Sequence, residues 1–272
     1  MFQSITNRPR GWCPVSAGSG LFVWLVCIAV ATNVAASDFQ PPFESPLTAR
    51  DSLTIGEEPS AESRACLQGL AWENADFQVQ CLPPSSLGGD ALVTFPSPLP
   101  SGKESNDRVT LEWYLARDLN DVPRHARAVV VVHESGSNMA VGRLIARNLR
   151  LQGLHTFLIH LPYYGERRQE KRRPDGSQLV PVIRQAICDV RRARDAVAAI
   201  PLVDQAHISL QGTSLGGIIS ATTAGLDHGY DSIHLMLAGG DLYGLLKNGQ
   251  RDAAKVREDL ERAGVTDDQL RE

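Results

Sequence analysis

The sequence predicts an α/β fold, in which helices cover both faces of a mostly parallel sheet and antiparallel strands lead into that sheet. Two observations support this class. Between residues 128 and 237, four strand-like runs alternate with helical patterns, as βαβ units do. Before residue 128, shorter strand-like runs are separated by Pro- and Gly-rich turns. The chain has 272 residues, 43% of them hydrophobic and 21% charged, which suits one globular domain or two small ones.

The first 36 residues have the pattern of a secretory signal peptide. An uncleaved membrane anchor is the alternative, but only the 16 residues 21–36 are available, and they include polar side chains. A span takes about 20 apolar residues. We therefore expect export to the periplasm or the extracellular space, and membrane attachment only if the segment is not cleaved. The pattern consists of Arg8 and Arg10, the apolar residues 21–31, and the small residues Val34 and Ala36 before the cleavage site.

Residues 37–75 are rich in Pro, Ser and Glu, which predicts an irregular lead-in to a domain over residues 76–272. In an oxidising compartment Cys66 and Cys81 would be able to pair. Cys188 lies in a helical pattern and is expected to be a small buried residue. No cysteine spacing resembles a zinc site, and we expect neither a metal nor an organic cofactor. The net charge of −4 gives no indication of a nucleic-acid partner.

The elements of the domain can be predicted in order. The runs 77–82 and 109–116 alternate in polarity, as half-covered antiparallel strands do, and 91–95 lies between them. The run 128–133 is continuously apolar, which predicts a strand buried on both faces. The later elements are a helix through 141–149 with Gly153 as its stop, a strand at 155–161, a helix at 181–200, and strands at 206–211 and 232–237.

Two groups of basic residues accompany these elements. In helix 181–200 the apolar side chains share one face, and the arginines at 184, 191, 192 and 194 fall mostly elsewhere. After strand 155–161, the basic residues Arg167, Arg168, Lys171, Arg172 and Arg173 predict a solvated loop, with an anionic-substrate site as the alternative.

Residues 212–217, GTSLGG, follow a predicted strand and open a helix. Gly212, Ser214 and Gly216 match the G-x-S-x-G nucleophile elbow, a sharp turn that exposes the serine hydroxyl at the end of a sheet. The backbone N–H of Leu215 would then be one oxyanion donor. The alternative is a glycine-rich turn in which Ser214 caps the helix. A dinucleotide or phosphate loop fits less well, because the glycine spacing differs and no lysine follows.

With VVVVHESGS and LIHLPYYGERR, this motif makes residues 109–245 resemble the α/β-hydrolase family, in particular its serine esterases and dienelactone hydrolases. The resemblance implies an eight-stranded sheet, and a Ser–acid–His triad, in that order, that acts on an ester or a related acyl bond of a small-molecule substrate. It also implies a second oxyanion donor at Glu134 or Ser135, and a structural role for His133. Tyr163 and Tyr164 would line the acyl pocket, with packing in the core or at the rim as the alternative.

The rest of the triad is not evident. Asp241 is a candidate acid, with a helix cap as the alternative, and no histidine follows His234, although the family has its base late in the chain. A charged helix over 251–264 is followed by a capping pattern from Thr266 to Gln269, three residues before the end.

The sequence thus predicts a fold that is incomplete at its C-terminus, without the last two strands and the base. Strand 232–237 would then have an open apolar edge. On this expectation the chain alone would be unstable or inactive. The competing interpretation is a non-catalytic binding or scaffolding protein that keeps the fold.

Overall fold

Eight strands form one mixed sheet in the order β1-β2-β3-β4-β6-β5-β7-β8. Neighbouring strands from β1 to β6 in this order pair antiparallel, and those from β6 to β8 pair parallel. Strand β6 therefore has one antiparallel and one parallel neighbour. The predicted α/β class, with antiparallel lead-in strands, is therefore confirmed. The strands are β1 (Leu47–Arg50), β2 (Asp76–Leu82), β3 (Ala91–Pro96), β4 (Arg108–Tyr114), β5 (Ala126–Val132), β6 (His155–Ile159), β7 (Val203–Thr213) and β8 (Ser232–Met236).

The structure is a computed structural model that describes residues 42–43, 46–56, 60–86, 88–168, 178–239, 242–250 and 252–268. These residues all belong to one unit, which begins at Phe39. The expected signal segment, residues 1–36, lies outside the described residues. None of the helices in the described ranges combines the length and the apolar character that crossing a membrane requires.

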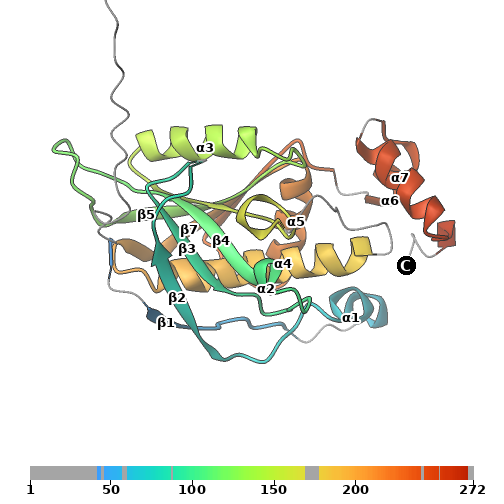
Figure 1. Cartoon of the computed structure of the whole chain (residues 1–272). Helices are drawn as coiled ribbons and strands as arrows, with labels where there is room; N and C mark the ends of the chain where they lie inside the picture. The colour runs from blue at the N-terminus through green and yellow to red at the C-terminus, as the bar shows by residue number, and fades with distance from the viewer. Residues whose placement is uncertain are drawn as a thin grey trace, which may run out of the picture. The chain divides into compact units, whose positions relative to one another are not determined.

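Helices cover the two faces of the parallel half of the sheet (Figure 1). Helix α3 (Ala140–Leu151) packs on one face against Val131 and Leu158, and α4 (Leu179–Ala198) and α5 (Leu215–Ala224) pack on the other against Val130 and Leu210. The alternation follows from the pleat, because successive side chains of a strand point to opposite faces. The remaining helices are α1 (Ala61–Leu67), α2 (Glu104–Asp107), η2 (Gly165–Arg167), α6 (Leu242–Asn248) and α7 (Asp252–Arg262).

The order of the parallel strands creates a switch point. From β5 the chain crosses by α3 to β6 on one side, and from β6 it crosses by α4 over β5 to β7 on the other side. Ligands of open α/β sheets bind beyond the carboxyl ends of strands at such a point. The topology therefore predicts that a ligand site lies among the loops that follow β5, β6 and β7.

Several local predictions are confirmed. Gly153 has a φ of 82° just after α3, and Gly264 a φ of 77° just after α7, so each glycine ends its helix in the left-handed region. Cys188 is buried in α4. Cys81 is also buried, but the side chain of Cys66 lies outside the described part, so their pairing stays a prediction. The capping pattern at residue 266 extends to Gln269, which is likewise outside the described residues.

Strand β4 differs from its prediction as a half-covered strand. All of its residues from Val109 to Tyr114 are buried, including Glu112. Helix α3 and η2 cover its polar face, so the alternation in the sequence reflects a buried polar cluster and not solvent. In β2, by contrast, buried and exposed residues alternate as predicted.

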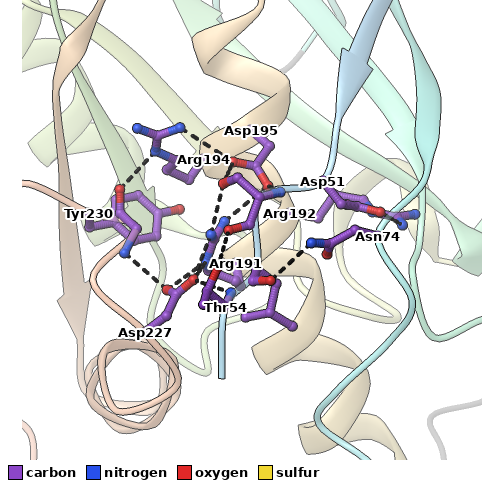
Figure 2. A network of polar contacts seen from close by, with 12 residues as sticks. Asp51, Thr54, Asn74, Arg191, Arg192, Arg194, Asp195, Asp227 and Tyr230 are labelled. Atoms are coloured by element: carbon purple, nitrogen blue, oxygen red, sulfur yellow. Dashed lines mark hydrogen bonds and ion pairs between the residues drawn. The ribbon is translucent and has the colours of Figure 1, made fainter. Parts of the chain in front are cut away.

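The lead-in, predicted to be irregular, contains β1 and α1. Tertiary contacts order it: the N–H and Oγ of Ser52 donate to Asp195 at 2.9 and 2.6 Å, and Arg192 pairs with Asp51 at 2.6 Å (Figure 2). Arg191 is 1% exposed and pairs with both Asp195 and Asp227. The arginines that the sequence places off the apolar face of α4 are therefore partly internal, because residues 51–54 cover them.

At the other end of the sheet, β8 pairs only with β7 among the described strands. Its apolar side chains are exposed, with Ile233 at 37%, Leu235 at 46% and Met236 at 48%. The open apolar edge expected for residues 232–237 is thus present in the described part of the chain.

Candidate active site

Backbone strain is concentrated in the loops that follow the parallel strands. Of five described non-glycine residues with positive φ, four lie in the segments that follow β5, β6, β7 and β8. They are Met139 (50°), Tyr163 (66°), Ser214 (53°) and Leu237 (54°). Bulky residues adopt this region only where the surroundings enforce it, and such strain is found preferentially at functional sites. The carboxyl edge of the parallel strands is therefore the candidate site.

Ser214 is the single residue between β7 and α5, with a φ of 53° and a ψ of −116°. Its N–H donates to the carbonyl of Met236 at 2.9 Å, and its own carbonyl accepts from the N–H of Ile218 at 3.1 Å. Its side chain makes no capping hydrogen bond to the helix, which argues against the interpretation of Ser214 as an N-cap. The residue is partly exposed, and its hydroxyl is not committed to capping α5.

The two glycines of the motif are required by close backbone packing. A Cβ on Gly212 would come within 3.0 Å of the carbonyl of Gly216, and a Cβ on Gly216 would come 2.6 Å from the carbonyl oxygen of His133. Real Cβ atoms essentially never approach other atoms this closely. The first turn of α5 is therefore pressed against the end of β5, which brings the loop after β5 next to Ser214.

Two backbone segments flank Ser214 at this edge, the start of α5 and the loop after β5. Leu215 opens α5, and the first N–H groups of a helix have no intrahelical acceptor. In the loop after β5, the carboxylate of Glu134 accepts from the N–H groups of Val141 and Gly142 at 3.1 and 3.0 Å and so caps α3. The carbonyl of Ser135 accepts from the hydroxyl of Tyr164 at 3.1 Å. The loop that holds Glu134 and Ser135 is thus fixed by hydrogen bonds to α3 and to Tyr164.

His133 lies at the end of β5 and is fully buried. Its Nε2 accepts from the N–H of Leu161 at 3.2 Å, so its Nδ1 carries the proton and donates to the carbonyl of Glu134 at 2.5 Å. Burial lowers the pKa of His133 to about 4. The ring also lies 4.6 Å from that of Tyr164, centroid to centroid. Both nitrogens are engaged, as a structural histidine requires.

The loop after β6 is ordered by α2. The N–H of Tyr163 donates to the buried side chain of Asn106 at 3.0 Å, and Lys103 donates to the hydroxyl of Tyr163 at 3.2 Å. Arg167 corrects the prediction of a solvated loop: it is fully buried and pairs with Asp189 at 2.8 Å. Its guanidinium also donates to the carbonyl of Asn106, so the arginine holds the loop in place. Arg168 is exposed, and residues 171–173 lie outside the described residues.

A buried carboxylate beneath these loops was not predicted from the sequence. Glu112 in β4 accepts from Arg143 at 3.0 and 3.1 Å and from His160 at 3.0 Å. Burial would raise its pKa, but the hydrogen bonds from His160 and Arg143 lower it to about 2. The only signal in the sequence is a single acid within the mostly apolar run VTLEWYLA. The alternation of polar and apolar residues in this run predicted that Glu112 faces solvent.

The described residues do not include a complete triad around Ser214. Asp241 lies outside the described residues. All seven histidines lie within them, and none is hydrogen-bonded to the hydroxyl of Ser214. Four histidines other than His133 form hydrogen bonds elsewhere: His155 with Trp113, His160 with Glu112, His207 with Asp204 and His234 with Ser232.

Comparisons with known proteins find similar folds only. No family model and no curated protein matches the chain. Among solved structures, an acetyl xylan esterase from Paenibacillus sp. R4 has a TM-score of 0.48 at 14% identity, over 77% of this chain and 69% of that one. The α/β hydrolase GrgF from Penicillium sp. sh18 has a TM-score of 0.41 at 18% identity, over 64% and 67%. DcsB, solved with a substrate analogue, has a TM-score of 0.38 at 20% identity, over 59% and 44%, so the chain spans less than half of DcsB.

The architecture is of the α/β-hydrolase type. The strand order, the switch point after β5 and the strand–turn–helix at Ser214 are the features that define it. The resemblance stated from the sequence is thus confirmed at the level of the fold.

Proposed function

We propose that this protein is an exported serine hydrolase in which Ser214 attacks the carbonyl carbon of an ester or a related acyl bond. The observation that carries the proposal is the backbone of Ser214, held at a φ of 53° with a side chain that caps nothing. A nucleophile elbow exposes its serine hydroxyl through a strained turn of this kind, at the carboxyl end of a strand and beside a switch point.

The chemistry assigns a part to each neighbour. As the Ser214 Oγ forms a bond to the carbonyl carbon, the carbonyl oxygen becomes an oxyanion, for which the N–H of Leu215 and an N–H near Glu134 or Ser135 are the proposed donors. The serine proton passes to a base and then to the leaving oxygen as the bond from carbon to that oxygen breaks. Water afterwards hydrolyses the acyl-serine.

Within the part of the chain that the structure describes, no histidine lies in place as the base. A serine hydroxyl is a weak nucleophile without one, and a positioned base contributes roughly 10²- to 10⁴-fold to the rate. Because no histidine is hydrogen-bonded to Ser214, we expect the isolated chain to react slowly and to respond to an added base such as imidazole. The same observation favours a second candidate, a non-catalytic binding protein that keeps the fold.

Labelling with a fluorophosphonate separates the two candidates. The serine hydrolase forms an adduct at Ser214, faster with added imidazole, and Ser214→Ala forms none. Ser220→Ala is the matched control, because Ser220 lies in the second turn of α5 and is fully buried. An unlabelled wild-type chain, with and without imidazole, would support the binding protein instead.

Export is proposed from the sequence of residues 1–36 alone. The mass of the mature protein tests it, since cleavage after Ala36 removes those residues. A mature chain that retains them would support an anchor.

A further inference from the structure

Glu112 stands out among the buried groups because it is charged, fully buried and distant in sequence from both loops that flank Ser214. It lies in β4, two strands from β5 in the sheet order. Burying a carboxylate is costly unless its oxygens are fully bonded. The hydroxyl of Tyr114, in the same strand, donates to its Oε2 at 2.8 Å. The other contacts that compensate for this cost come from an anchor residue of each loop.

The first anchor is Arg143, in the first turns of α3. Its guanidinium donates to both carboxylate oxygens of Glu112, at 3.0 Å to Oε1 and 3.1 Å to Oε2. The remaining Nη1 donates to the carbonyl of Asn138 at 2.5 Å. Asn138 precedes Met139, the strained residue at the end of the loop after β5. The carboxylate thereby fixes Arg143, and Arg143 fixes the loop proposed to hold an oxyanion donor.

The second anchor is His160, at the start of the loop after β6. Its Nδ1 accepts from the N–H of Glu166 at 3.1 Å, so the Nε2–H donates to Glu112 at 3.0 Å. Gly165, with a φ of 49°, lies flat against the same ring, where a Cβ would be 2.7 Å from Cε1. The loop after β6 thus packs against the imidazole of His160 at Gly165 and donates a hydrogen bond to it from Glu166. Glu112 fixes the orientation of that imidazole by accepting from its Nε2–H.

The two loops also join each other, through Leu161 N–H to His133 and Tyr164 hydroxyl to the carbonyl of Ser135. They meet the elbow where Gly216 packs on the end of β5. A continuous series of hydrogen bonds and close contacts therefore leads from Glu112 to the turn at Ser214.

We propose that Glu112 is a positioning residue, which sets both loops around Ser214 through Arg143 and His160. This inference deepens the proposed function but has a structural consequence that does not depend on activity. Without the carboxylate, Arg143 and His160 lose their common acceptor, and the backbone at 134–139 and 160–167 is expected to loosen.

The test compares Glu112→Gln with Asp51→Asn in the full chain. Both replace a buried carboxylate that binds an arginine through two nitrogens, but Asp51 binds Arg192 beneath the lead-in, away from both loops. Amide hydrogen exchange, followed by mass spectrometry, is the readout that needs no activity. Glu112→Gln is expected to speed exchange at least 10-fold in both loops, and Asp51→Asn only near residues 51–54 and at Ala75, whose N–H donates to Asp51.

The same variants are then labelled with a fluorophosphonate in imidazole. A 1 Å displacement near a reacting group costs up to about 10²-fold, so Glu112→Gln is expected to lower the labelling rate at saturating reagent about 10- to 100-fold, with little change in the reagent concentration at half-saturation. Asp51→Asn is expected to leave both within about 3-fold.

The outcomes are distinct. Uniform or unchanged exchange in Glu112→Gln, or loop exchange equally fast in Asp51→Asn, overturns the positioning role. Unlabelled wild-type protein with selective loosening of both loops overturns the proposed function and leaves the positioning role supported.

Discussion

Lowering the pH is expected to destabilise this protein through His133. The ring is buried with both nitrogens bonded, and its pKa is lowered to about 4, against 6.5 for an ordinary histidine. Between pH 6.5 and 4 the unfolded chain therefore binds a proton that the folded chain does not. Stability is fully present above pH 6.5 and is lost as the pH falls, by linkage.

The size of the effect follows from the two values. A pKa difference of about 2.5 is worth at most about 3 kcal/mol, and integration from pH 7.5 to 5 gives about 2 kcal/mol. His155, whose pKa burial also lowers, acts in the same direction. Urea unfolding followed by tryptophan fluorescence at both pH values measures the change.

The matched variant is His133→Gln, because an amide also offers one donor and one acceptor. Its stability at pH 7.5 is expected to be lower, and its loss between pH 7.5 and 5 smaller than that of the wild type by about 2 kcal/mol. Equal losses in the two proteins would refute the assignment of a buried neutral ring to His133.

Three further predictions concern packing and the sheet edge. Gly216→Ala forces a methyl against the end of β5 and should lower the unfolding free energy by about 1–3 kcal/mol, whereas Gly56→Ala, with nothing within 4 Å, should change it by less than about 1 kcal/mol. Asp227→Asn leaves buried Arg191 short of a partner and should cost about 3 kcal/mol in urea unfolding; a neutral result would deny the pair a structural role. Leu235→Lys on the exposed edge strand should reduce self-association in sedimentation velocity, and an unchanged distribution would exclude β8 as the associating edge.

The sequence predicted seven of the eight strands, because long apolar runs and turn residues are local signals. It did not predict β1, which is short and depends on pairing with β2 and on the ion pairs of Asp51 with α4. The burial of Arg167 and Arg191 was also missed. A charged residue is normally solvated, and only the fold shows which acid lies opposite each arginine.

For the candidate site, the sequence predicted the turn at Ser214 and the two glycines, since the motif is contiguous and its steric demands are local. Glu112 was missed because its partners, Arg143 and His160, are 31 and 48 residues away. Contacts of this kind depend on strand order, which alternation along one strand does not encode.

The position of the adduct after fluorophosphonate treatment tests the central claim most directly. Tandem mass spectrometry of peptides from the native chain, labelled in imidazole, is expected to find the phosphonyl group on Ser214 alone, and to find none after labelling in urea, where the turn is lost. An adduct spread over other serines, or equal labelling of the folded and unfolded chains, would contradict the account.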